Sequence, residues 1–472
     1  MVNKNFITDL LKSLKTKYQA VIDDAVTFYN DYSDCHEVYE RECKRCKDVQ
    51  KQIKTINSYK KEHGVYPQIK DQPDAESYLK ELEKLQEKAE KQISHVEPIV
   101  LEGFKRRKRL ISNVIQPMMD LLMNDRDASQ FIATMLLRAP MPDDRSRCPN
   151  NEMNKPLYIA ALSIALVRRL NDNNTMENDF ISSLAPNVVQ VENTTETHYD
   201  PEQLAQFQQY VLTPVITACL IHNIGSYSKQ ALNLYKGDRY QVFDETTRKV
   251  LISSIYEQSK KYLTYGLGDP RLSRQHMDEH QHHMDEEAFE LCESILVNYS
   301  SAQNPNGNLL RIPMIYASFM LSTKQNHDYV ISFKAYDILK GGIENQIIYQ
   351  PYAEEFLNMV GQYPLGTGIF FYSTETEVPE RAVVTGLNPP EPSSAIVKQL
   401  TRKQLQFDDH TQVRTSKGYI ISNKEAREAS RFDGKYYKKQ FPNGFFWNPS
   451  EVWERDIDHH QFWRRDNNIK KN

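Results

Sequence analysis

Apolar side chains recur at helical spacing through residues 1–112. Residues 10–22 and 79–85 each place them three or four positions apart, and a stretch with Gly and Pro at 64–74 separates the two stripes. The pattern predicts an antiparallel helical pair that resembles a short coiled coil. Such an arm commonly mediates dimerisation or contact with a protein partner, and the alternative is a solvated helical bundle.

Residues 113–360 predict a second, strongly helical region. Its apolar runs at 158–170 and 211–221 have no polar face, which indicates buried helices rather than surface strands. Short β-branched runs bounded by Pro, Gly or Asn then predict a small β extension over 361–415. The last segment, 416–472, is an aromatic and basic tail. The expected fold class is therefore mainly α, with a helical arm, a helical core and a small C-terminal β-containing extension.

Composition narrows the class of protein. The chain has 472 residues, of which 39% are hydrophobic and 26% charged, so it can bury a core and is not a disordered tract. Its net charge of -4 argues against a globally basic nucleic-acid binder, although local basic patches are compatible with it. A mean hydropathy of -0.66 points to surface-rich helical parts.

The same sequence predicts where the protein resides. No run of 18 or more apolar residues occurs and the N-terminus lacks the apolar core of a signal peptide, so no membrane span is expected. Six scattered cysteines are too few for a disulfide framework in a chain of this length. We therefore expect a cytoplasmic, reducing location.

One doublet could carry metal chemistry. His222 and Asn223 follow a buried apolar run, and Gly225 and Ser226 close the segment. A His followed by an acidic residue in this setting would be a metal-binding pair, but Asn223 keeps the shape of Asp without its charge. Taken alone, a buried His at a helix end is more often structural than a ligand.

The order of motifs along the chain is more specific than this doublet. These motifs lie, in chain order, at residues 155–163, 222–225, 244–245, 291–307, 311–312, 356–366, 382–384 and 387–389. In this order, residues 110–415 resemble the HD-GYP family of cyclic di-GMP phosphodiesterases, a helical branch of the HD metal-dependent phosphohydrolases. The resemblance implies a helical HD-domain-like core, linked through Gly361-Gln362-Tyr363-Pro364-Leu365-Gly366 to a small β extension.

The resemblance also implies where the ligands of a dinuclear metal centre would lie, and most of those positions differ here. Lys155 stands near the first family His, Asn223 replaces the Asp of the doublet, and Ser226 stands where a Lys commonly acts. The other differing positions are Ile255, 298–300, 303–307 and Ala317 or Ser318. Only His222 matches as a ligand, and one imidazole cannot hold two metal ions. Catalysis by the family mechanism is therefore not expected.

The function implied by the resemblance is that of a catalytically impaired relative of cyclic di-GMP phosphodiesterases in bacterial signalling. Such a protein would act by binding a nucleotide, cyclic di-GMP, or a protein partner, and no cofactor is expected. Two alternatives stay open. One is an active metal-dependent phosphodiesterase with divergent ligands, which would hold Fe or Mn. The other is an inert dimeric scaffold.

Lys155 suggests how the pocket could have changed its ligand. If the side chain of Lys155 points into the former metal pocket, its ammonium occupies the space of a divalent ion. A lysine ammonium also pairs well with a phosphate group. The ligand-binding candidates are therefore Lys155, His222, Asn223 and Ser226.

The densest cluster of titratable residues spans 276–287. If this segment is helical, His276, His280 and His283 share one face and two of them could chelate a transition metal. We expect a polar loop or helix start that binds Zn or Ni only adventitiously. A relocated catalytic metal site, shared with His222, is the alternative.

A second metal-like set lies in the predicted arm. On a continuous helix His36, Cys43 and Cys46 share a face, but the sequence supplies no fourth ligand. We expect ordinary helix residues there rather than a structural Zn site.

Basic residues cluster at two further places. Residues 105–109 form an uninterrupted run of Lys and Arg, which favours a solvated helix face or partner contact over a phosphate or lipid contact. The tail mixes basic residues with Trp447, Trp453 and Trp463. We expect these aromatic side chains to pack the tail against the body rather than stack on nucleobases.

Overall fold

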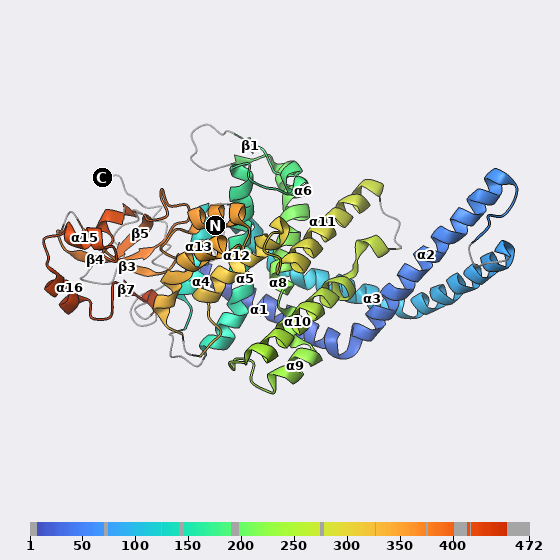
Figure 1. Cartoon of the computed structure of the whole chain (residues 1–472), viewed down its shortest axis with the longest axis horizontal. Helices are drawn as coiled ribbons and strands as arrows, with labels where there is room; N and C mark the ends of the chain where they lie inside the picture. The colour runs from blue at the N-terminus through green and yellow to red at the C-terminus, as the bar shows by residue number, and fades with distance from the viewer. Residues whose placement is uncertain are drawn as a thin grey trace, which may run out of the picture.

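Helices make up most of the protein, and a small β-sheet lies near its C-terminal end. The computed structural model describes residues 7–69, 74–123, 125–140, 146–189, 198–273, 278–325, 327–373, 376–400, 413–415 and 417–450. The expected mainly α fold with a small β extension is confirmed. The molecule is elongated, with a helical hairpin projecting at one end and the sheet at the other (Figure 1).

The elements follow one another along the chain as described here. The α-helices are α1 (Ile7–Thr27), α2 (Ser33–His63), α3 (Ala75–Leu122), α4 (Asp125–Leu137), α5 (Arg147–Asp172), α6 (Asp179–Ser183), α7 (Pro201–Phe207), α8 (Thr213–Ile221), α9 (Lys229–Tyr235), α10 (Glu245–Lys261), α11 (Glu279–Asn298), α12 (Pro305–Met320), α13 (Ala335–Glu344), α14 (Gln350–Val360), α15 (Lys424–Glu428) and α16 (Gly434–Gln440). The π-helical turns are η1 (Phe28–Tyr32), η2 (Gln208–Leu212) and η4 (Tyr262–Gly268), and the 3-10 turns are η3 (Ile224–Tyr227), η5 (Pro270–Leu272), η6 (Tyr329–Lys334) and η7 (Lys417–Tyr419). The strands are β1 (Val188–Val189), β2 (His198–Tyr199), β3 (Gly368–Tyr372), β4 (Pro379–Val384), β5 (Ala395–Leu400), β6 (Val413–Thr415) and β7 (Phe446–Trp447).

The projecting hairpin consists of α2 and the first half of α3. α2 ends just before Gly64, whose φ of 72° is a left-handed conformation that glycine adopts without strain. α3 begins after Asp74, whose carboxylate accepts hydrogen bonds from two backbone N–H groups of the first turn. The same helix runs without a break past residue 112 and enters the body. The far part of the hairpin has its own small apolar cluster around Val49, Ile56 and Leu82.

A buried arginine joins the hairpin to the body. The side chain of Arg107 on α3 is 1% exposed and forms an ion pair of 3.0 Å with Asp24 on α1. Its guanidinium also donates to the carbonyl oxygen of Gly266 at 2.9 Å and lies 3.1 Å from Nε2 of His36. The ring of Phe28 lies under it, with 4.7 Å between the guanidinium carbon and the ring centroid. Four segments of the chain therefore meet at one guanidinium.

The body packs around α8, which is apolar on all sides. All of its residues from Pro214 to Ile221 are buried, and α5, α11 and the preceding turn η2 pack against it. In the described part of the chain, Pro201–Tyr227 is the stretch long and apolar enough to cross a membrane. Because 67% of its apolar window is buried inside the protein, it is accounted for as a core helix.

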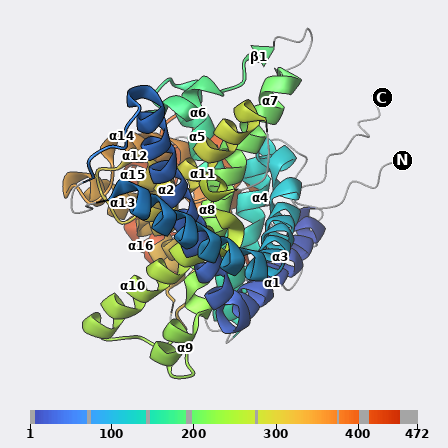
Figure 2. The same ribbon diagram turned by 90° about the vertical axis from the view of Figure 1, so that its right-hand side faces the viewer.

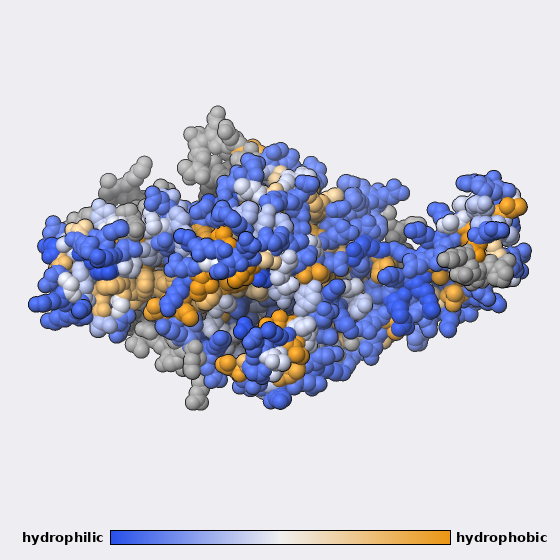
Figure 3. Space-filling model, in the orientation of Figure 1, coloured by the Kyte–Doolittle hydropathy of each residue, from blue (hydrophilic) through white to orange (hydrophobic). Residues whose placement is uncertain are grey.

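Smaller elements project from two sides of the body. Seen from the hairpin end, α9 and α10 extend on one side, and α6 and α7 lie on the other (Figure 2). Hydrophobic side chains reach the surface over α9 and α10, including Leu232, Val250 and Ile252 (Figure 3). The hairpin surface seen in Figure 3 is mostly hydrophilic, as its charged sequence predicts.

The sheet joins the predicted β extension to the tail. Its five antiparallel strands lie in the order β6-β5-β4-β3-β7, so the tail contributes the edge strand β7 beside β3. Trp447 donates its indole N–H to the carbonyl oxygen of Ile369 at 3.0 Å, and Phe446 stacks on Phe333 with ring centroids 3.7 Å apart. The described tail residues are thus packed as the aromatic content predicts, whereas Trp453 and Trp463 lie outside the described residues.

The buried arginine predicts a large effect on stability. We expect Arg107→Met to lower the free energy of unfolding by about 3 kcal/mol, because it leaves the buried carboxylate of Asp24 with less compensation. Arg109→Met removes an exposed charge two residues away, and should change stability by less than about 0.5 kcal/mol. Urea unfolding followed by circular dichroism measures both. Equal effects of the two substitutions would show that the buried pair is unimportant.

Candidate functional site

Helix α5 places several polar side chains in the interior of the body. Asn151, Asn154 and Tyr158 lie three or four residues apart, as Lys155 does from Asn151 and Tyr158, and the three uncharged residues are at most 1% exposed. The amide of Asn151 donates to the carbonyl oxygen of Ser322, just beyond α12, at 2.9 Å. We call Asn151, Asn154, Lys155, Tyr158 and His222 the α5 site.

His222 lies at the C-terminal end of α8 and is 9% exposed. Its Nδ1 lies 2.7 Å from the carbonyl oxygen of Cys219, so Nδ1 carries the proton and donates it. Burial lowers the pKa of His222 to about 4, the Cys219 carbonyl opposes this shift, and the charge of Lys155 adds to it. The imidazole is therefore neutral at pH 7.

Lys155 supplies a cation whose charge acts on that neutral imidazole. Its side chain is half-buried, and burial together with the charge of Lys324 lowers its pKa to about 8. Most Lys155 side chains therefore still carry a proton at pH 7. This charge is one of the two causes that lower the pKa of His222.

The other two ligand-binding candidates differ from one another. Asn223 is half-buried at the start of η3. Ser226 is buried and already occupied, because the guanidinium of Arg239 donates to its Oγ and to its carbonyl oxygen, both at 3.0 Å. The same guanidinium pairs with Glu152 of α5 at 2.6 Å. Ser226 therefore anchors Arg239 and is not available to a ligand in this arrangement.

The remaining aligned positions supply no metal ligand. Ile255 contributes a backbone contact, since a Cβ added to Gly225 would lie 2.2 Å from its carbonyl oxygen. Ala317 is fully buried, and the exposed hydroxyl of Ser318 donates to the carbonyl oxygen of Ile315. No group of three or more His, Cys, Asp or Glu that could hold a metal ion occurs within the described ranges.

The structure also describes most residues of the two other clusters that resemble metal sites, one at 276–287 and one in the hairpin. His276 lies outside the described residues, and His280 and His283 are exposed on the first turns of α11. In the hairpin, Cys43 and Cys46 are buried as free thiols in an apolar cluster, and His36 contacts Arg107 as described above.

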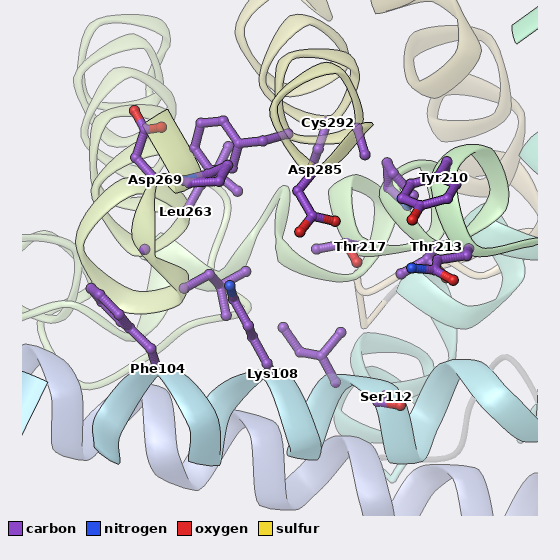
Figure 4. A pocket seen from close by; sticks show the side chains of 18 of the residues that line it. Phe104, Lys108, Ser112, Tyr210, Thr213, Thr217, Leu263, Asp269, Asp285 and Cys292 are labelled. Atoms are coloured by element: carbon purple, nitrogen blue, oxygen red, sulfur yellow. The ribbon is translucent and has the colours of Figure 1, made fainter. Parts of the chain in front are cut away.

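A large cavity lies where the hairpin meets the body. It has a volume of about 760 Å³ and is lined by α3, η2, α8, η4, η5 and α11, together with Tyr39 and Glu40 of α2. Lys108 reaches into it from α3 and Asp285 from α11 (Figure 4). We call this space the arm cavity. No local sequence pattern predicts this cavity, because its walls come from five separate stretches of the chain, and only the cation run at 105–109 points there.

One wall of the arm cavity contains a buried carboxyl group with a raised pKa, that of Glu40. Glu40 on α2 is 4% exposed, and its Oε2 has no hydrogen-bond partner within the described part of the chain. Burial and the nearby Asp269 carboxylate raise the pKa of Glu40 to about 8, although Lys47 and the backbone N–H of Asp269 oppose this shift. Glu40 is therefore mostly protonated at pH 7.

Comparison with protein-family models, with curated proteins and with solved structures finds no match for this chain. The resemblance to the HD-GYP family therefore rests on the ordered motifs of the sequence.

The link between Lys155 and His222 can be measured. In Lys155→Met we expect the pKa of His222 to rise from about 4 towards its ordinary value of 6.5, because one repelling charge is gone while burial persists. An NMR titration of the imidazole protons gives this pKa. Lys249→Met, on the exposed surface of α10, removes the same charge and should leave the titration unchanged. An unchanged His222 pKa in Lys155→Met would place the two groups too far apart to interact.

The raised pKa of Glu40 predicts a pH-dependent stability. Between its ordinary value of 4.5 and about 8, the folded protein keeps a proton that the unfolded chain releases, so this group lowers stability as pH rises. Glu40→Gln has no carboxyl to titrate, so its free energy of unfolding should not show this loss. Relative to the native protein, it should become more stable by roughly 2–4 kcal/mol as pH rises from the lower to the upper end of this window. Urea unfolding at both ends of the window tests this, with the exposed Glu62→Gln on the same helix as control. Parallel pH profiles for Glu40→Gln and the native protein would contradict it.

Proposed function

We propose that the protein is a non-catalytic relative of the HD-GYP phosphodiesterases that binds a phosphate-bearing nucleotide, cyclic di-GMP, at the α5 site. The observation that carries this proposal is that the charge of Lys155 acts on His222, the one residue that matches a family ligand. We name cyclic di-GMP as the ligand because of the family resemblance. The charges at the site are the reason for proposing binding without hydrolysis.

The charges at the site disfavour a divalent metal. Lys155 and Lys324 repel one another and would repel any cation placed between them. The carboxylate of Glu152 is nearby on α5, but it is engaged by Arg239 and by the hydroxyl of Tyr240. A dinuclear centre that activates water needs several anionic ligands, which this arrangement does not offer.

The same charges favour an anion. A phosphate near Lys155 would offset the repulsion from Lys324 and would raise the fraction of Lys155 that is protonated. The Tyr158 hydroxyl is buried without a hydrogen-bond partner among the described residues and can donate to a phosphate oxygen, whereas the equally unpartnered Oδ1 atoms of Asn151 and Asn154 can only accept, from water or from an N–H or O–H of a ligand. Buried polar atoms of this kind are normally satisfied by water or by a ligand.

Calorimetric titration with cyclic di-GMP tests the proposal. We expect binding to the native protein and at least about tenfold weaker binding to Lys155→Met, because a charge-assisted contact to phosphate is lost. Lys80→Met, on the exposed surface of the hairpin, is the matched control and should bind as the native protein does. Titration with inorganic phosphate separates recognition of the phosphate from recognition of the nucleotide.

Two other outcomes would favour the alternatives. About two Fe or Mn per chain in protein purified without a His tag, together with hydrolysis of cyclic di-GMP, would establish a metal-dependent phosphodiesterase. An absence of binding heat at high nucleotide concentration would leave the scaffold interpretation, in which the projecting hairpin mediates contacts with a partner or a second copy.

A further inference from the structure

The arm cavity has the size and shape of a site for an elongated small molecule. Its volume of about 760 Å³ falls within the range of about 300–1,000 Å³ that is typical of ligand pockets. Its lining on α3 runs from Leu101 to Met119. At 1.5 Å per residue this distance is about 27 Å along the helix axis.

Most of the wall is apolar. Beyond Lys108, towards the C-terminal end of α3, the lining side chains include Ile111, Ile115 and Met119. Across from α3 they come from three other segments, and the residues are Pro214, Leu263, Leu267, Ala288, Phe289 and Cys292. Such a wall contacts hydrocarbon well and leaves water in the cavity with few hydrogen-bond partners.

Two π-helical turns help to form the cavity. η2 contributes Gln208, Gln209 and Tyr210, and η4 contributes Leu263, Leu267 and Gly268. π-helical turns are rare and occur frequently at functional sites. Gly268, with a φ of 83°, is held so close to the ring of Phe104 that an added Cβ would lie 2.6 Å from it. The wall is therefore shaped by backbone as well as by side chains.

Lys108 is an exposed, charged side chain in the middle of this apolar wall. Lys108 extends from α3 into the cavity and remains accessible there, yet enough protein surrounds it to lower its pKa (Figure 4). The carboxylate of Asp285 partly opposes that shift without forming a direct ion pair with Lys108 in the described structure. Asp285 instead accepts a hydrogen bond of 3.0 Å from Gln281, which in turn accepts one from Tyr210.

The other charged groups leave an excess of positive charge in the cavity. Asp269 is held by the guanidinium of Arg271, with an ion-pair distance of 2.8 Å, and the carboxyl of Glu40 is mostly neutral at pH 7. Lys105, one turn before Lys108, adds a second cation to the lining. Two cations therefore face one unneutralised carboxylate, that of Asp285, and a single anionic group is the best-matched ligand charge.

We propose that the arm cavity binds an amphipathic carboxylate of the fatty-acid type. Its carboxylate would pair with Lys108, and its hydrocarbon chain would lie along Ile111, Ile115 and Met119. The distance from Lys108 to Met119 is about 17 Å along the helix, which suits a saturated chain of medium length. Because the walls come from both the hairpin and the body, the bound ligand would also stabilise the junction between them.

Displacement of a fluorescent fatty acid, dansyl-labelled undecanoic acid, from the full-length protein tests this proposal. Laurate should displace the probe, and lauryl alcohol, which has the same chain without the charge, should do so at least about tenfold less well. Lys108→Met should weaken laurate about tenfold and leave the alcohol unchanged. Ser112→Trp should fill the cavity and abolish binding of probe, acid and alcohol.

Two control variants test whether the loss of laurate binding is specific to the arm cavity. Lys80→Met carries the same substitution on the exposed part of α3 and should bind laurate normally. Lys155→Met should also bind laurate normally, because the α5 site is separate from the arm cavity. Equal affinity for laurate and lauryl alcohol, or normal binding by a folded Ser112→Trp variant, would overturn the proposal. Circular dichroism and the melting temperature establish that each variant is folded.

Discussion

A guanidinium group that is 1% exposed needs an opposite charge and hydrogen-bond acceptors around it, and the junction of hairpin and body supplies these to Arg107. Asp24 provides the opposite charge, Gly266 a carbonyl oxygen, and the ring of Phe28 a polarizable face. These partners come from α1, η4 and η1, so the rotation of α3 about its own axis is fixed. With Arg107 turned inwards, the next residue, Lys108, must face a different direction, and that direction is the arm cavity.

The two ligand sites use lysine in different surroundings. At the α5 site, Lys155 lies among buried amides and a neutral His222, with a second cation close by, so a compact anion would relieve repulsion. In the arm cavity, Lys108 stands in an apolar wall opposite Asp285, where only a ligand with a long apolar body fills the volume. We propose phosphate groups as the ligand of the first site and the carboxylate of an amphiphile as the ligand of the second.

The hydrophobic pattern predicted the fold class and the packing of the described tail, because both depend on which side chains avoid water. It also indicated a continuous helix through His36, Cys43 and Cys46, and this is confirmed by α2. The cation run at 105–109 was predicted to be a solvated face or partner contact. That prediction was wrong for Arg107, which is buried, because helical rotation separates neighbouring residues by about 100° and the tertiary partners of each differ.

The sequence by itself determined that the chain is mainly helical, because the spacing of apolar side chains that predicts helices is a local property. Only the tertiary structure decided that the charge of Lys155 reaches His222, that Ser226 is held by Arg239, and that an arm cavity exists. The physical reason is distance. Charges, hydrogen bonds and cavities depend on groups far apart in the chain that meet in space, and no local pattern encodes that meeting.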